Sequence, residues 1–207
     1  MNWLDLINVI ANILIGITAV VALWFSMKAL RKSEWDSAMN TAPSLILRPN
    51  RIWVGTRRKD EGGYGVIEPG HLIRREANFA EIVFRVEFEC FNAGRGVAFN
   101  ILQPIVEGMS IINSEYNRIP LYQTLEDEPF RIDLQISKNF SEWINEVNKG
   151  IAARLIITYT NDQNNVFCRS SWTAMVKPFT IEDENLKVKE TRLLRRRSKI
   201  EYSSKPF

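Results

Sequence analysis

Histidine occurs once in the 207 residues and cysteine twice. The single imidazole, His71, cannot supply a multi-histidine metal site, and it lacks the acidic partners of a catalytic triad. The thiols of Cys90 and Cys168 fall in alternating strand patterns, which favour buried, reduced cysteines over a disulfide scaffold. The scarcity of these residues disfavours metal and nucleophilic-thiol chemistry.

Phosphate-binding loops and cation-binding loops are also missing. The glycines within 62–65 lack the Lys-Ser or Lys-Thr pair that holds a nucleotide. The acidic cluster at 126–128 precedes Pro129 in a turn and lacks the spaced oxygens and the glycine of a calcium loop. We therefore predict no metal, no cofactor and no enzymatic activity.

Charge is absent from Leu6 to Phe25, and this apolar run dominates the chain. About twenty helical residues span about 30 Å, the thickness of the hydrocarbon layer of a bilayer. A signal peptide would carry its positive charges first, whereas here Asp5 precedes the run and Lys28, Arg31 and Lys32 follow it. The pattern predicts a retained transmembrane helix with the lipid bilayer as a partner.

The basic flank also predicts the orientation, because Lys and Arg next to a membrane span are retained on the cytoplasmic side. We expect a single-pass protein of the cell inner membrane with the N-terminus outside and the body in the cytoplasm. Small and polar residues recur within the span at intervals of three or four, which places them on one helix face. An asparagine amide in hydrocarbon needs a partner and small residues allow close approach, so this stripe predicts a homo-oligomer. Its members are Asn8, Asn12, Gly16, Ala19, Leu23 and Ser26.

The remainder of the chain is long enough for one domain with its own core. Period-two alternation over Glu81–Phe91 and Phe130–Ile136 predicts half-buried strands. Helical spacing from Phe140 to Val147 predicts a short helix, and Ile151–Thr160 with Val166–Val176 predicts a hairpin. The fold class is therefore mainly β, with an N-terminal transmembrane helix followed by an antiparallel immunoglobulin-like β-sandwich with one short helix.

Three regions follow from this pattern: an anchor with a juxtamembrane helix at 1–40, the sandwich at 41–179, and a charged tail at 180–207. The tail begins with acidic and continues with basic residues, which predicts a helix or a disordered segment. A tethered basic tail favours contact with anionic lipid over nucleic acid, as does the modest net charge of +3. Its lipid-contact candidates are Arg192, Arg195, Arg196 and Arg197.

Other basic residues lie in predicted loops, where guanidinium groups suit phosphate or carboxylate. A glycine-containing loop is expected from Thr56 to Gly65, and a glycine turn at 92–96. The candidates for binding an anionic ligand are Arg57, Arg58, Lys59, Arg74, Arg75 and Arg95. Solvated surface charges are the alternative interpretation unless these residues converge in space.

The run from Phe91 to Ile101 resembles the Asn-x-Gly-x-Gly-x-Ala-x-Asn turn of bacterial single-pass membrane proteins with an immunoglobulin-like cytoplasmic sandwich. Tyr159 to Asn165 resembles the late hairpin of the same proteins. Some of those proteins are similar to membrane components of bacterial anti-phage systems, so the resemblance implies a role in antiviral defence.

Three functions fit these observations. The first is a non-enzymatic, membrane-anchored binding and assembly protein that self-associates. The second is a ligand-gated membrane effector whose basic loops bind an anionic nucleotide. The third is an accessory subunit of another membrane protein.

Overall fold

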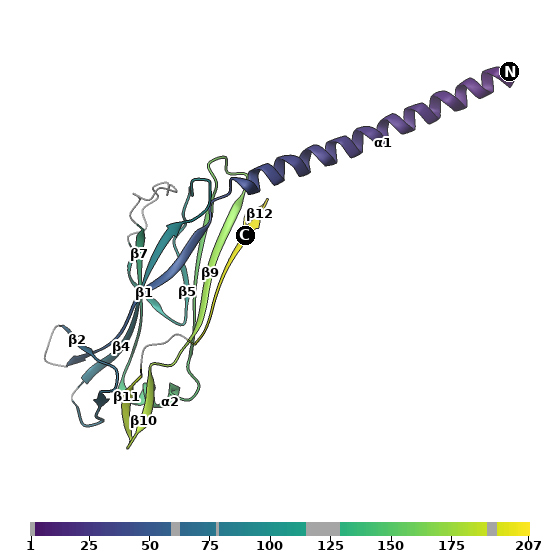
Figure 1. Cartoon of the computed structure of the whole chain (residues 1–207). Helices are drawn as coiled ribbons and strands as arrows, with labels where there is room; N and C mark the ends of the chain where they lie inside the picture. Colours follow the sequence, from purple (N-terminus) through teal and green to yellow (C-terminus); the bar gives the residue numbers. More distant parts are fainter. Residues whose placement is uncertain (1–2, 59–62, 78, 115–128, 190–193) are drawn as a thin grey trace. The chain divides into compact units, whose positions relative to one another are not determined.

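The computed structural model describes residues 3–58, 63–77, 79–114, 129–189 and 194–207. The chain forms two compact units, Met1–Thr41 and Ala42–Phe207. The first unit is a helix and the second unit holds all the described strands (Figure 1).

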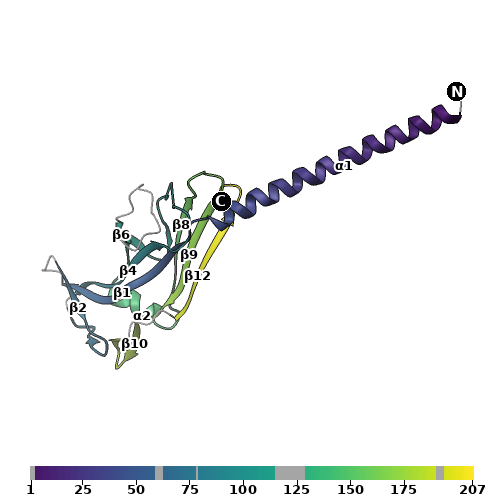
Figure 2. The same cartoon turned by 45° about the horizontal axis from the view of Figure 1, so that its top comes forward.

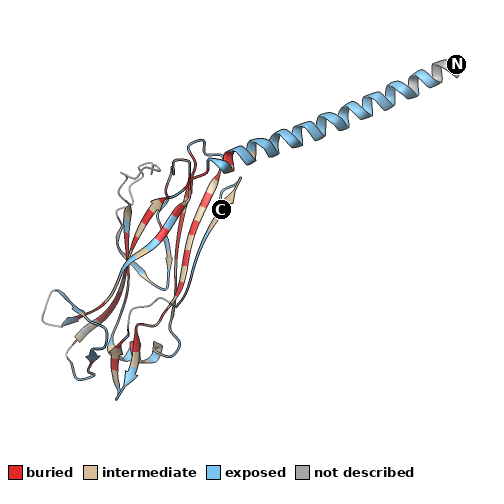
Figure 3. Ribbon diagram, in the orientation of Figure 1, coloured by how far each residue is buried: buried red, intermediate tan, exposed pale blue. Residues whose placement is uncertain are grey.

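Helix α1 runs from Trp3 to Asn40 and has 38 residues. At about 1.5 Å per residue it is about 57 Å long, nearly twice the thickness of a hydrocarbon layer. The segment Ile10–Asn40 contains a window long and apolar enough to cross a membrane. All residues from Ile10 to Glu34 are exposed in the single chain (Figure 3). The helix therefore has a long apolar surface that the single chain leaves uncovered.

The larger sheet of the second unit has five antiparallel strands in the order β2-β1-β4-β7-β6. These strands are β2 (Tyr64–Ile67), β1 (Leu45–Arg58), β4 (Phe79–Asn92), β7 (Phe130–Lys138) and β6 (Ser110–Ser114). The alternation predicted for Glu81–Phe91 forms the centre of this sheet.

The second sheet has four antiparallel strands in the order β12-β9-β8-β5. They are β12 (Leu194–Ser203), β9 (Phe167–Val176), β8 (Ile151–Thr160) and β5 (Ile105–Glu107). In β9 every second residue is buried and the others are half-buried, so one face packs inward and the other faces solvent.

The two sheets pack through their apolar faces, and buried residues alternate along the strands in both (Figures 2 and 3). Phe88 of β4 meets Trp172 of β9 edge to face, with ring centroids 4.8 Å apart. Both rings are fully buried, and burial of each such side chain stabilises the fold by roughly 1.5–3 kcal/mol. This packing makes the second unit a β-sandwich.

A small third sheet and a short helix complete the unit. The sheet has the order β10-β11-β3, with β10 (Phe179–Glu182), β11 (Asn185–Val188) and β3 (Leu72–Ile73). Helix α2 is Phe140–Glu146, and its buried Trp143 packs edge to face on the ring of Phe179.

Helix α2 begins where its sequence predicts. Asn139 and Glu142 form a capping box, in which each side chain accepts a hydrogen bond from the other's backbone N–H. The indole of Trp143 donates to the carbonyl of Ile82 at 2.8 Å, which ties the helix to β4. Gly150 ends the following turn with a φ of 73°.

The prediction of a helical or disordered tail at 180–207 is wrong for its described residues, which form most of β10, all of β11 and all of β12. The acidic residues interpreted as a helix start form a two-residue hairpin loop, with Asp183 and Glu184 at φ 49° and 62°. In β12, Ile200 and Tyr202 alternate with charged residues, and pairing with β9 stabilises this period-two pattern more than a thin helical stripe could.

Strand β1 is continuous across Pro49, with a register irregularity between Pro49 and Arg51. One further boundary differs from the prediction. The loop expected from Thr56 to Gly65 is shorter, because Thr56 lies in β1 and Gly65 lies in β2, paired with each other. Residues 59–62 of that loop lie outside the described residues.

The predicted fold class is confirmed: the chain is mainly β, with a long apolar N-terminal helix, antiparallel sheets packed as a sandwich and one short helix beside them. Cys90 and Cys168 are both free and buried, as their strand positions predict.

Candidate functional site

The sandwich has two ends, which the strands define. We call the end with Ala42–Leu45, Asn92–Gly94 and Asn161–Val166 the proximal end, because the chain passes there from α1 into the sandwich. We call the opposite end, where β1 finishes at Arg58 beside Phe79, the distal end. Strand β4 connects the ends with 14 residues, which at about 3.3 Å each extend over about 46 Å.

At the proximal end the first strand is hydrogen-bonded to the opposite sheet. The backbone N–H of Leu45 donates to the hydroxyl of Tyr159 at 2.9 Å, and the hydroxyl of Ser170 donates to the carbonyl of Leu45 at 2.5 Å. The two hydroxyls lie 2.9 Å apart. Ser44 Oγ is 2.6 Å from the hydroxyl of Tyr202 in β12. These contacts bind residues 44–45 firmly to both sheets.

The glycine turn at 92–96 holds the same segment from the other side. The side-chain oxygen of Asn92 accepts hydrogen bonds from the N–H groups of Ser44 and Gly94, each at 3.0 Å. Its amide donates to the carbonyl of Gly96 at 2.7 Å. A Cβ on Gly94 would lie 2.4 Å from the nitrogen of Ser44 and 2.6 Å from the oxygen of Ala42. The Asn-x-Gly turn that carries the family resemblance therefore has a structural role, which is to hold residues 42–44 in place.

Burial keeps the hydroxyl of Tyr159 and the thiols of Cys90 and Cys168 neutral. Burial raises the pKa of the Tyr159 hydroxyl above its ordinary value, raises the pKa of the Cys168 thiol to about 12, and raises the pKa of the Cys90 thiol as well. A nucleophilic cysteine needs a lowered pKa. These thiols therefore serve as core residues.

The predicted oligomer stripe lies on α1, and its six residues are all exposed in the single chain. Thr18, on another face, satisfies its own hydroxyl by donating to the carbonyl of Leu14 at 2.8 Å. Lys28 lies over the ring of Trp24, 5.3 Å from its centroid.

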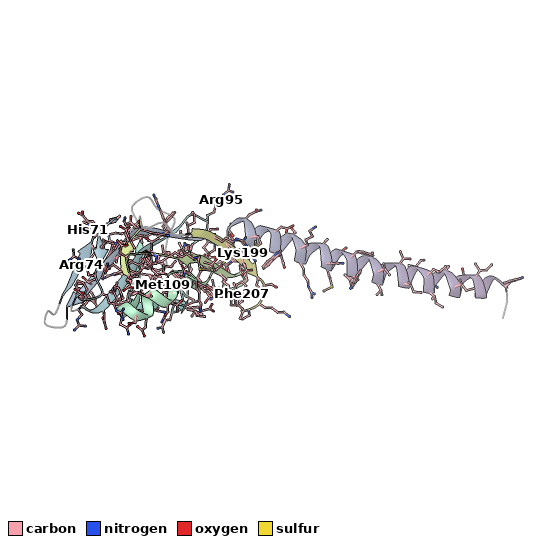
Figure 4. All side chains as sticks on the ribbon, turned by 90° about the horizontal axis from the view of Figure 1, so that it is seen from below. His71, Arg74, Arg95, Met109, Lys199 and Phe207 are labelled. Carbon is pink, nitrogen blue, oxygen red and sulfur yellow. The ribbon has the colours of Figure 1, made fainter. Side chains whose placement is uncertain are left out.

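The basic loop candidates do not form one cluster. Arg57, at the end of β1, and Arg74 and Arg75, between β3 and β4, are exposed at the distal end. Arg95 is exposed at the proximal end, and Figure 4 shows Arg74 and Arg95 far apart. Lys59 lies outside the described residues, as does the side chain of Arg58 at the end of β1. The described members of this set therefore lie too far apart to form one binding site.

One distal candidate does border a hollow. Arg75 lines a depression of about 340 Å³ together with the exposed face of α2 and Glu184 of the β10–β11 turn. The apolar residues Phe140, Ile144 and Ile181 form the rest of its surface. The charges of Arg75 and Glu184 oppose each other, so this hollow has no net preference for anions.

Among the tail candidates, Arg192 lies outside the described residues. Arg195, Arg196 and Arg197 lie in β12, and the side chain of Arg197 is exposed, whereas those of the other two are outside the described set. Because β12 pairs with β9 over most of its length, Arg197 belongs to a sheet face and not to a free tail. Lipid contact by this segment stays a prediction.

The outer face of the four-stranded sheet gathers four cations, and only Arg197 among them was predicted. In register, Arg154 of β8 and Arg197 of β12 flank Thr173 of β9. One step along β12, Lys199 lies beside Ser171, and one further step places Glu201 beside Arg169. Arg154 and Arg169 alternate with buried positions, and Lys199 and Glu201 alternate with half-buried ones, so each strand pattern is visible in the sequence. The convergence of these residues depends on strand register, which the sequence does not reveal.

Glu201 is the carboxylate within this group. Its carboxylate forms an ion pair with the ammonium group of Lys199, and Arg169 Nη1 lies 3.9 Å from its carboxyl oxygen. The hydrogen bond from Lys199, with the charges of Arg169 and Arg154, lowers the pKa of the Glu201 carboxyl. At the sheet edge Glu107 pairs with Arg154 at 3.6 Å. Counting Arg154, Arg169, Arg197 and Lys199 against Glu107 and Glu201, this face keeps a surplus of positive charge.

A mostly apolar pocket of about 390 Å³ lies next to these cations, at the proximal end of the same face. Thr158 of β8 and Phe167 of β9 line it from the sheet, and Leu102 and Phe207 line its sides. The ring of Phe207 is 4.0 Å from the guanidinium carbon of Arg169. Arg169 therefore lies between the pocket and the other cations. Lys199 and Phe207 are labelled in Figure 4.

Two asparagines stiffen the polar rim of the pocket. Asn100 and Asn164 both have a left-handed backbone, with φ 46° and 55°. Asn164 accepts hydrogen bonds through Oδ1 from the amide of Asn100 at 2.8 Å and from the hydroxyl of Thr160 at 2.7 Å. The rim is therefore preformed, as small-molecule sites usually are.

Within the described ranges, no three His, Cys, Asp or Glu side chains gather as a metal site would require. Comparisons of the chain with models of protein families, with curated proteins and with solved structures found no match, so the resemblance to single-pass membrane proteins with a cytoplasmic sandwich stays a prediction.

Proposed function

We propose that the chain is a non-enzymatic, membrane-anchored binding and assembly protein that self-associates through α1. One observation carries this proposal: the small and polar stripe lies exposed on a helix long and apolar enough to span a bilayer. In hydrocarbon the amides of Asn8 and Asn12 lose water and need hydrogen-bond partners. A second copy of the helix supplies matching amides in the same register.

The sandwich favours an assembly role over catalysis. Its buried thiols have raised pKa values, and its tyrosine–serine contacts at the proximal end bind backbone groups instead of facing a cleft. Those same contacts fix residues 44–45 to both sheets. The domain therefore offers a rigid body whose outer faces are available to a partner or a ligand.

The double substitution N8L/N12L tests the self-association. It removes both amides, and each interhelical hydrogen bond in a membrane contributes roughly 0.5–2 kcal/mol, so we expect the dissociation constant of the oligomer to rise at least about fivefold. The measurement is the oligomer mass of the full chain in mild detergent as a function of dilution, by light scattering.

Thr18→Val is the matched control, because its hydroxyl already bonds within its own helix and lies off the stripe. It should leave the dilution curve unchanged. An oligomer equally stable in N8L/N12L and in the parent chain would assign assembly to the sandwich and contradict the proposal.

We further propose that the sandwich faces the cytoplasm of the inner membrane. The basic residues Lys28, Arg31 and Lys32 lie between the apolar run and the sandwich. A reporter enzyme fused after Phe207 should be active only if it is a type that works in the cytoplasm. Activity of a reporter that works only in the periplasm would show that the sandwich lies on the opposite side of the membrane.

A further inference from the structure

The outer face of the four-stranded sheet combines two features that different parts of one ligand would use. At the proximal end it has the preformed apolar pocket of about 390 Å³, within the range of about 300–1,000 Å³ typical of small-molecule sites. Directly beside the pocket it has Arg169, and beyond Arg169 it has Lys199, Arg154 and Arg197. Neither the apolar pocket nor the cationic row belongs to the anchor or to the predicted basic loops.

Arg169 is the residue that connects these two features. Its guanidinium lies over the ring of Phe207, which lines the pocket, at 4.0 Å. Its Nε is enclosed and has no hydrogen-bond acceptor among the described residues. Its nearest carboxylate contact, from Nη1 to Glu201, is 3.9 Å long, which is beyond hydrogen-bond range. The enclosed Nε is out of reach of a ligand, but the side chain keeps 30% of its surface exposed, so the other N–H groups of the guanidinium can donate to a ligand oxygen.

Glu201 does not neutralise the site. Lys199 already bonds its carboxylate, and three more guanidinium groups face the same surface. The hydroxyl of Thr173 lies between Arg154 and Arg197 and can donate to an anion as well, whereas the hydroxyl of Ser171 already donates to the carbonyl of Lys199 at 3.4 Å. Charge complementarity therefore favours a phosphate or carboxylate group.

We infer that this face binds a small amphiphilic anion, with its aromatic or other apolar body in the pocket beside Phe207 and Leu102 and its phosphate or carboxylate on Arg169 and Lys199. The inference rests on the binding role proposed above and names the ligand class for it. It does not depend on self-association, because every residue involved belongs to the sandwich.

The test uses the full chain in nanodiscs of neutral phosphatidylcholine, with empty nanodiscs as the blank. The probes are 1-naphthyl phosphate, inorganic phosphate and a neutral naphthyl glucoside, and binding is measured by saturation-transfer NMR and equilibrium dialysis. We expect 1-naphthyl phosphate to bind at least about tenfold more tightly than inorganic phosphate or the naphthyl glucoside, because only 1-naphthyl phosphate contacts both the pocket and the cations. No binding of 1-naphthyl phosphate, or equal binding of inorganic phosphate, would overturn the inference.

Three variants locate the site. Arg169→Gln should weaken 1-naphthyl phosphate binding about tenfold by removing the charge and the fork of donors. Leu102→Trp should weaken it by filling the pocket from an exposed side-chain position, without touching the core. Arg131→Gln, an exposed arginine of β7 in the other sheet, should have no effect. If the Arg131 variant matched the Arg169 variant, binding would be non-specific and the inference would fail.

Two sources can supply this ligand chemistry, a soluble aromatic anion and an anionic lipid. Repeating the measurement with phosphatidic acid in the nanodiscs separates them, because a lipid that occupies the site will compete with 1-naphthyl phosphate. Competition assigns the site to lipid, and its absence assigns it to a soluble anion. If N8L/N12L stays oligomeric while the probes bind as expected, the proposed assembly fails but the ligand site stands, so the two failures are distinguishable.

Discussion

Replacing Gly94 by alanine is expected to lower the free energy of unfolding of the sandwich by about 3 kcal/mol. The new Cβ would lie 2.4 Å from the nitrogen of Ser44, 2.6 Å from the oxygen of Ala42 and 2.7 Å from the carbonyl carbon of Pro43. All three atoms are backbone, so no side chain can move aside. The segment that joins the helix to the sandwich would have to shift and lose its hydrogen bonds to Asn92 and Tyr159.

The measurement is thermal unfolding of the full chain in detergent, followed by near-ultraviolet circular dichroism. For a domain of this size 3 kcal/mol corresponds to about 9 °C in the midpoint. Gly65→Ala is the matched control, because its Cβ would meet only the Thr56 oxygen, at 4.0 Å. Equal midpoints for the two variants would show that the approach of residues 42–44 to Gly94 is not close.

Replacing Asn92 by alanine is expected to cost a similar amount, about 3 kcal/mol. The substitution leaves the N–H groups of Ser44 and Gly94 without their shared acceptor, and the carbonyl of Gly96 without its donor. Asn92→Asp should be intermediate, because it keeps the acceptor and loses the donor. Chemical denaturation, with the same spectroscopic readout, gives the free energies.

Asn185→Ala is the control for this second prediction. Asn185 also bonds two backbone groups, the N–H of Arg75 and the carbonyl of Asp183, but both bonds are exposed. Its loss should cost less than about 1 kcal/mol, since water replaces exposed hydrogen bonds. If Asn92→Ala cost as little stability as Asn185→Ala, the hydrogen bonds of Asn92 would have no role in holding residues 42–44.

The Asn-x-Gly pattern shows how far the sequence could predict this structure. It indicated a turn after the strong strand at Glu81–Phe91, and a turn is present. Its purpose depends on residues 42–44, about 50 positions earlier in the chain, whose approach only the folded structure reveals. Strands with clear period-two alternation and the capped helix α2 were predictable because their signals are local.

The tail shows the opposite case. Acidic residues followed by basic ones fit a helix dipole, and the same residues fit a tight hairpin and an edge strand. Long-range pairing with β9 decided between them, and a single sequence does not contain that information. For the same reason Arg154, Arg169 and Lys199 escaped prediction, although they lie about 15 to 45 positions apart and meet on one face.

We propose above that α1 holds the chain in a membrane as more than one copy. The most direct test labels the full chain with one fluorophore, extracts it with its lipids in native nanodiscs, and counts bleaching steps in single particles. We expect two or more bleaching steps for the parent chain and predominantly one step for N8L/N12L. Single-step bleaching of the parent chain, or label that remains in the soluble fraction before extraction, would contradict it.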